Sequence, residues 1–255
     1  MKKILLTLAM AALVLTSFGQ TRVIAHRGLW TPSGSAQNSI ASLRLAAENG
    51  CYGSEFDVQL SRDGVVVVNH DEATDDGTII SMHDWSDLQS KTLKNGEQLS
   101  LLSAYLDEGK KHPGTQLILE IKAQPTPEAE DQITAAAVNL VNERGMGRQV
   151  EYISFSWRVC CRLRQLLPQA AVYYLNSDKT PMEVAQAGLT GIDYDYNVVF
   201  KHPEWVEQAH RLGMKVNVWT VDKRDDLKHA IDLGVDFITT NQPQVAMEMI
   251  GASSR

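Results

Sequence analysis

Cysteine is scarce in this sequence of 255 residues, which has three, at positions 51, 160 and 161. An odd number of cysteines with two of them adjacent is not the pattern of a disulfide framework. We therefore expect at least one of them to be buried as a small apolar side chain. A disulfide between Cys51 and either Cys160 or Cys161 is the alternative left open.

Long apolar runs are lacking after the N-terminus. The single one, residues 4–14, follows two lysines and precedes small residues up to Gly19. This order is typical of a secretory signal peptide that is cleaved just after Gly19. The run is too short for a comfortable membrane span, and no cysteine lies near Gly19 to carry a lipid. We therefore interpret residues 1–19 as a signal peptide and residues 20–255 as a soluble, exported protein, periplasmic or extracellular, without stable membrane insertion.

Basic residues are outnumbered by acidic ones. Lysine and arginine total 24 against 31 aspartates and glutamates, a formal net charge of −7, and removal of the signal peptide takes away two lysines and leaves −9. A chain this acidic is a poor general binder of nucleic acid or of an anionic membrane. An anionic substrate must therefore meet local positive groups or a metal ion.

A glycine-rich dinucleotide fingerprint is absent after the first predicted strand, which counts against an open doubly wound sheet. Strand and helix patterns instead alternate in units of roughly 20 to 25 residues, as in parallel sheets with helical crossovers. The predicted strands are 23–28, 54–61, 65–69, 117–122, 151–156, 171–175, 191–196, 215–221 and 236–240. The predicted helices are 39–49, 84–90, 101–111, 127–143, 158–167, 181–188, 203–212, 224–233 and one near 245.

The strand count selects the fold. If residues 65–69 form the antiparallel arm of a hairpin, eight strands remain, the number of a (β/α)8 barrel, and about 235 residues after the signal peptide match its usual length. Residues 72–116 are longer than a simple connection, so we expect an insertion that covers the site. The prediction is one α/β domain, a (β/α)8 TIM barrel with a small insertion after this hairpin; an open doubly wound sheet is the alternative.

The hairpin itself carries acids. Asp63-Gly64 between two extended runs is a strong turn signal. Before it, Glu55 and Asp57 are two residues apart, which on a strand places both carboxylates on one face, about 7 Å apart along the backbone. Two such acids repel each other unless a cation joins them. After the turn, the second run ends in His70. A surface hairpin with solvated acids is the alternative.

In a (β/α)8 barrel the chemistry lies at the carboxyl ends of the strands. The residues predicted there are His26 and Arg27, Glu55 and Asp57, His70, Glu120 and Lys122, and Trp219. Each has a structural alternative: the acids can be ion-pair partners of the cations, either histidine can be structural, and Trp219 can be barrel packing instead of a substrate contact. Asp71 either orients His70 or caps the next turn. The joint arrangement favours a functional site.

The residue types at these strand ends favour one kind of chemistry. Three carboxylates without a nearby cysteine favour a hard divalent ion, Mg²⁺ or Ca²⁺. Two histidines on separate strands suit a general acid and a general base. Arg27 and Lys122 supply positive charge, and arginine matches phosphate oxygens with its planar fork. Together these groups suit phosphodiester cleavage, whose transition state is more anionic than the substrate. A glycosidase would leave the cations and histidines unexplained.

The chain also resembles a known family, the glycerophosphodiester phosphodiesterases. The matching motifs are HRG at 26–28, EFDV at 55–58, DG and VVVVNHD at 63–71, LEIK at 119–122, VWTVD at 218–222 and ITTNQP at 238–243. The resemblance implies a TIM barrel, with a metal held by Glu55, Asp57 and Glu120. It also implies an acid/base pair, His26 and His70, with Arg27 and Lys122 on the phosphate.

By that resemblance the substrate is a small-molecule glycerophosphodiester. A glycerol hydroxyl next to the phosphoester would attack phosphorus, one histidine would take its proton and the other would protonate the leaving alcohol. Water would then open the cyclic phosphate to give glycerol 3-phosphate. The insertion at 72–116 matches the family's own and would help to enclose the glycerol.

The chain departs from the family pattern at three places. The usual Pro-Glu-Asn-Thr run is replaced by AQNS at 36–39, so Gln37 lacks a carboxylate; the turn at 72–77 is altered; and Asn241 stands where aspartate is common. The primary hypothesis is a glycerophosphodiester phosphodiesterase. The alternatives are a phosphodiesterase for a sugar-linked or lysophospholipid diester, and a weakly active binding protein on the same barrel.

Overall fold

The computed structural model describes residues 20–31 and 34–253. The predicted signal peptide lies outside this part of the chain. Within it, no helix combines the length and the apolar character that a membrane span requires.

A closed barrel of parallel strands forms the centre of the molecule. Its eight strands among the described residues are β1 (Arg22–Ala25), β2 (Gly53–Leu60), β5 (Gln116–Ile121), β6 (Val150–Ser154), β7 (Val172–Tyr174), β8 (Gly191–Asp195), β9 (Lys215–Trp219) and β10 (Phe237–Thr240). The barrel closes because β1 pairs in parallel with both β10 and β2. The predicted (β/α)8 fold is confirmed.

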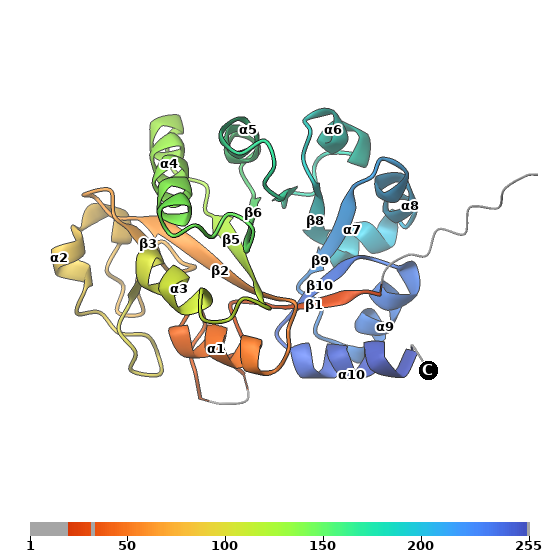
Figure 1. Cartoon of the computed structure of the whole chain (residues 1–255), viewed down its shortest axis with the longest axis horizontal. Helices are drawn as coiled ribbons and strands as arrows, with labels where there is room; N and C mark the ends of the chain where they lie inside the picture. The colour runs from red at the N-terminus through yellow and green to blue at the C-terminus, as the bar shows by residue number, and fades with distance from the viewer. Residues whose placement is uncertain (1–19, 32–33, 254–255) are drawn as a thin grey trace, which may run out of the picture.

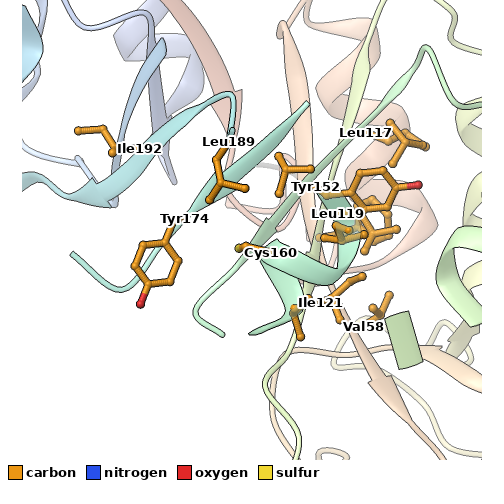
Figure 2. Close-up of a cluster of buried hydrophobic side chains, with 14 of the residues drawn as sticks. Val58, Leu117, Leu119, Ile121, Tyr152, Cys160, Tyr174, Leu189 and Ile192 are labelled. Carbon is orange, nitrogen blue, oxygen red and sulfur yellow. The ribbon is translucent and has the colours of Figure 1, made fainter. Parts of the chain in front are cut away.

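Side chains that alternate along the strands divide between two apolar cores. Inside the barrel, Ile24, Ile118, Ile153 and Phe237 belong to one buried cluster. The residues that alternate with these along each strand point outward and pack under the helices. Figure 2 shows this for Leu117, Leu119, Ile121 and Tyr152, which lie near Cys160 of the covering helix. The strands are therefore apolar on both faces, as expected for a buried parallel sheet.

Helices surround the barrel (Figure 1). They are α1 (Ile40–Glu48), α3 (Leu102–Gly109), α4 (Pro127–Glu143), α5 (Trp157–Leu166), α6 (Pro181–Gln186), α7 (Tyr196–Lys201), α8 (Glu204–Arg211), α9 (Arg224–Leu233) and α10 (Pro243–Ser253). Helix α7 was not predicted, because its aromatic and β-branched residues have low helix propensity and continue the strand pattern of β8. It begins because the side chain of Asp195 accepts a hydrogen bond from the backbone of Asn197.

The extra predicted strand is β3 (Val66–Val68), which pairs antiparallel with the end of β2. It pairs in turn with β4 (Ser100–Leu101), and between them lie η1 (Ile80–Met82) and α2 (Trp85–Leu88). Val67, Ile80, Leu88 and Leu99 give this insertion a small core of its own. The insertion extends to the left of the barrel in Figure 1. Neither β4 nor η1 was predicted, since β4 has only two residues and η1 only three.

The three cysteines are free. Cys51 and Cys160 are buried, as expected for small apolar side chains, and Cys161 is partly exposed. The alternative of a disulfide to Cys51 is therefore wrong.

Candidate active site

The polar residues predicted at the strand ends gather at one end of the barrel. His26 and Arg27 follow β1 directly, Glu55 and Asp57 lie in β2, and Glu120 lies near the end of β5. Parallel strands bring these positions together, and Asp57 is the register partner of Glu120. Eight strands that point the same way thus assemble side chains from distant parts of the sequence.

Three carboxylates form the centre of the site. Glu55, Asp57 and Glu120 are 3%, 1% and 6% exposed, so they lie almost completely out of water. One oxygen from each lies within 4.8 Å of the others. Buried carboxylates this close together are unstable as free anions and need a cation.

Lys122 supplies part of that positive charge. Its Nζ lies 2.8 Å from Oδ1 of Asp57 and 2.7 Å from Oε1 of Glu120. Nε of Arg27 lies 3.8 Å from Oδ2 of Asp57. The ion pairs considered as the structural alternative are therefore present, and they lie inside the same cluster as the carboxylates.

The HRG segment places Arg27 through an unusual backbone. Arg27 has φ of 55° and Gly28 has φ of 79°, both in the left-handed region. A Cβ on Gly28 would lie 2.3 Å from Oγ of Ser42, so only glycine fits. In this conformation the Arg27 amide donates to Oε2 of Glu55 at 2.8 Å, and its Nη1 donates to Oε1 of Gln37 at 2.7 Å.

His26 has a defined tautomer. The Nδ2 group of Asn241 donates to Asp222 at 2.8 Å, which turns its Oδ1 toward Nδ1 of His26 at 2.9 Å. Because a carbonyl oxygen accepts, Nδ1 donates and Nε2 is the ring nitrogen left for proton transfer. Nε2 lies 4.0 Å from Oε2 of Glu55. Burial, then the charge of Arg27, lowers the pKa of His26 to about 4, so the ring is neutral at pH 7.

His70 is held in a similar way. Its Nδ1 lies 2.7 Å from Oδ1 of Asp71, so Asp71 orients the ring, as one of the two predicted alternatives has it. The backbone oxygen of His70 accepts a hydrogen bond from Gln59 at 3.0 Å. Burial lowers the pKa of His70, and the charge of Asp57 opposes that shift.

The three carboxyl groups differ in pKa according to the charges and donors around them. Burial, then the charge of Asp57, raises the pKa of Glu120 to about 7, and burial raises that of Glu55 well above its usual range. Asp57 behaves in the opposite way: burial opposes ionisation, but Lys122 and other donors lower its pKa to about 2. The carboxyl groups of Glu55 and Glu120 therefore still require positive charge beside them. A donor set made only of carboxylates suits a hard divalent cation.

A cavity of about 130 Å³ opens over these groups. It is lined by both histidines, Glu55, Glu120 and both cations, with Ile153, Phe155, Leu175 and Trp219 as an apolar wall. The indole Nε1 of Trp219 donates to the backbone oxygen of Asp193 at 2.9 Å, and its ring meets Phe155 edge-on at 5.4 Å. Trp219 is therefore anchored in the barrel and also borders the cavity.

Comparison with known proteins agrees with this geometry. The "Glycerophosphoryl diester phosphodiesterase family" model matches residues 26–245. The chain belongs to this family. A glycerophosphodiester phosphodiesterase structure from Parabacteroides distasonis ATCC 8503 is 42% identical, with a TM-score of 0.91 over 92% of this chain and 99% of that one. The glycerophosphodiester phosphodiesterase of Caldanaerobacter subterraneus subsp. tengcongensis is 26% identical over 91% of this chain and 98% of its own length.

This member of the glycerophosphoryl diester phosphodiesterase family is accordingly an enzyme, a hydrolase, and it contains a buried acidic site suited to a divalent metal. Its insertion borders a second cavity, of about 220 Å³, which His70 also lines. That cavity is lined by Trp30 and Gln37 from the loop after β1, and by Asp71, Asp75 and Lys94 from the insertion. The insertion thus lies beside the site, as expected.

Several residues of the site were missed. Asn38 is 2% exposed and holds Asp57 with Nδ2 to Oδ2 at 2.8 Å. Asp222 supports Asn241, and Asp193 borders the cavity from β8. Asn38 follows the HRG loop, and Asp222 lies in a matched motif, so a signal existed for both. For Asp193 the inward alternation of the strand was the single available signal.

Proposed function

We propose that this enzyme hydrolyses glycerophosphodiesters to glycerol 3-phosphate and an alcohol, with His26 and His70 as the acid/base pair. The observation that carries the proposal is that both histidines, two of the buried carboxylates and both cations border one and the same cavity. A structural relative supports the product: the phosphodiesterase OLEI02445 of Oleispira antarctica, 23% identical with a TM-score of 0.78, was solved in complex with sn-glycerol-3-phosphate.

We further propose that Glu55, Asp57 and Glu120 hold one divalent cation, Mg²⁺ or Ca²⁺. The donor set fits, because three buried carboxylates with oxygens within 4.8 Å exceed the positive charge around them. When bound, such an ion supplies positive charge to the phosphoryl oxygens and to the attacking hydroxyl. The pKa values of Glu55 and Glu120, raised by burial, agree with a site that is stabilised by a cation.

The chain's own residues supply the remaining chemistry. Arg27 and Lys122 would bind and orient the phosphate oxygens as negative charge develops on them. The hydroxyl next to the phosphoester attacks phosphorus. One of the two histidines starts neutral and takes its proton at Nε2; the other starts as the imidazolium and gives its Nε2 proton to the oxygen of the departing alcohol. The P–O bond to that alcohol breaks and a cyclic phosphate forms. Water then adds to phosphorus with the histidine roles reversed and opens the ring to glycerol 3-phosphate.

The supporting residues fix the proton positions. Asn241 and Asp71 each hold an Nδ1–H, which leaves Nε2 of either ring as the exchangeable position. The histidine that acts as the base starts neutral, and the histidine that acts as the acid starts with a second proton, on Nε2. Phe155 and Trp219 give the cavity an apolar wall beside these groups.

The test is release of glycerol 3-phosphate from glycerophosphocholine and glycerophosphoethanolamine, each with Mg²⁺, with Ca²⁺ and with a chelator. Release that the chelator abolishes and a cation restores supports substrate and metal together. Release that persists in chelator contradicts the metal. A purified, folded protein that releases nothing from either substrate but cleaves a sugar-linked or lysophospholipid diester favours the alternative substrate class.

The histidine roles need variants. We expect His26→Ala and His70→Ala each to lower kcat by at least about 10²-fold, within the range of general acid–base catalysis. His202→Ala is the matched control, since His202 is exposed and stacks on Trp205 away from the cavity. Circular dichroism and thermal unfolding should show that all three variants fold. Near-normal turnover in either site variant would remove that histidine from the mechanism.

A further inference from the structure

A buried acid on β8 borders the active-site cavity and has no part in the chemistry proposed above. Asp193 is 2% exposed, and it lines the cavity together with His26 and Glu120. The strand order places three strands between β8 and β2 on either side, so Asp193 faces the carboxylates of β2 across the barrel. A ligand in the cavity would lie between them.

Asp193 belongs to a small polar floor. Asp193 is the register partner of Asn217, and Asp195 is the partner of Trp219, so the first pair lies one inward-facing step deeper than the indole. Asn217 Nδ2 donates to Oγ1 of Thr239 at 2.9 Å. Thr239 borders the cavity as well. Three neighbouring strands therefore contribute one polar side chain each beneath the apolar wall.

The floor has unused hydrogen-bonding capacity. Among the described residues, Oδ1 of Asp193 and Oδ1 of Asn217 are buried and have no hydrogen-bond partner. The hydroxyl of Thr239 accepts from Asn217 and still has its own proton to donate. Buried polar groups in folded proteins are nearly always paired, so a group left over beside a cavity points to a ligand.

The character of the floor indicates which ligand. Burial raises the pKa of Asp193 to about 8, with the nearby Asn217 amide opposing the shift, so at pH 7 the group is a neutral acid that both donates and accepts. Ile153, Leu175 and Trp219 around it are apolar. A neutral mixture of donors and acceptors in a small, largely apolar cavity suits an uncharged hydroxyl better than an ammonium or a second phosphate.

We propose that Asp193, with Asn217 and Thr239, binds the terminal hydroxyl of the glycerol unit and so selects glycerophosphodiesters over diesters of alcohols without that hydroxyl. The phosphate end of the substrate lies toward the carboxylates and cations, and the terminal hydroxyl reaches across the barrel to β8. The hydroxyl next to the phosphoester stays free for the attack on phosphorus. This inference rests on the proposed function and deepens it.

The test pairs a protein change with a substrate change. Glycerophosphocholine is compared with the phosphocholine diester of propane-1,2-diol, which keeps the hydroxyl next to the phosphoester and lacks the terminal one. We expect the wild-type enzyme to prefer glycerophosphocholine in kcat/KM by roughly 10- to 100-fold, the loss typical of an unpaired polar site. Asp193→Ala should lose most of this preference, because its activity falls far more on the glycerol diester than on the propanediol diester.

Two further variants keep the test independent of folding. Asp193→Asn preserves the size of the side chain and Thr239→Val removes one hydroxyl, and each should lower the preference by a smaller factor. Asp195→Asn is the matched control on the same strand: it caps α7 and does not line the cavity, so it should keep the full preference. Thermal unfolding is measured for all four.

The outcomes separate the inference from the function on which it rests. A wild-type enzyme that cleaves both diesters equally well overturns the hydroxyl site and leaves the hydrolase intact. Variants at Asp193 that weaken both substrates by the same factor, with the preference unchanged, assign Asp193 a structural role and also overturn the inference. A folded wild-type enzyme that cleaves neither diester overturns the proposed function itself.

Discussion

The substitution Glu120→Gln should stabilise the metal-free protein and at the same time weaken its response to divalent cations. Glu120 is 6% exposed, and burial followed by the charge of Asp57 raises its pKa from 4.5 to about 7. For an acid whose pKa is raised on folding, the ionised form destabilises the folded state. The cost is absent below pH 4.5, where both states are protonated, and grows as the pH rises to about 7.

The size of this effect follows from the two pKa values. The shift corresponds to a destabilisation on the order of 3 kcal/mol at pH 8, and to less than about 1 kcal/mol at pH 5. Glutamine keeps the shape of the side chain and removes the charge. In the presence of a chelator, Glu120→Gln should therefore raise the free energy of unfolding by about 3 kcal/mol at pH 8 and by less than about 1 kcal/mol at pH 5.

The assay is urea unfolding at both pH values, with chelator, with Mg²⁺ and with Ca²⁺. Divalent cation should stabilise the wild type, because it binds the folded state alone, and should stabilise Glu120→Gln much less. Glu108→Gln is the contrasting control. Burial opposes the ionisation of Glu108, yet hydrogen bonds from Lys111 and Arg44 lower its pKa to about 2, so the same substitution should destabilise the protein at pH 8. A Glu120→Gln protein less stable than the wild type in chelator at pH 8 would refute the reasoning.

Three further predictions follow. Lys122→Met removes the ammonium that bridges two of the three acids, and should lower kcat/KM by about 10²- to 10³-fold in steady-state kinetics; near-normal activity would contradict its role. Asp236→Asn should destabilise the protein by about 1–3 kcal/mol at pH 7. Burial alone would raise the pKa of Asp236, but hydrogen bonds from His210 and Lys215 lower it, so the ionised carboxylate stabilises the folded state. That stability is lost as the pH falls below 4, and a difference in thermal unfolding that is unchanged at pH 3 would contradict the prediction. If the signal-peptide proposal holds, N-terminal sequencing of the exported protein begins at Gln20; an intact N-terminus on exported protein would argue against cleavage there.

The barrel could be predicted from local signals. Helix caps, stop glycines and period-two strands give the order of elements. The Asp-Gly turn made residues 65–69 one candidate for the extra strand among nine, and the antiparallel pairing of β3 with β2 decides the choice. Eight parallel strands then leave few arrangements, because crossovers are short and of one hand. Where the prediction was incomplete, at α7 and β4, tertiary contacts outweigh weak local preferences.

The centre of the site could be predicted because its residues lie at strand ends, where fold geometry places them together. The supporting residues could not, because their partners lie far along the chain. His26 and Asn241 are separated by 215 positions, and Asn38 and Asp57 by 19 across two elements. A single sequence records neither pairing. The position of Asp193 within the barrel likewise depends on how the barrel closes. Closure determines which inward-pointing residues line the cavity and which pack below it.

The charges at the mouth of the barrel link the cation to the substrate. When ionised, Glu55, Asp57 and Glu120 outnumber Arg27 and Lys122 by one negative charge. Lys122 reaches two of the carboxylates, and the pKa values of Glu55 and Glu120 are nevertheless raised, so the cluster remains short of positive charge. A divalent cation would change the balance from −1 to +1, and a phosphodiester carries a single negative charge that would neutralise it. Cation and diester should therefore each raise the affinity for the other, since each supplies the charge that makes the other's burial favourable.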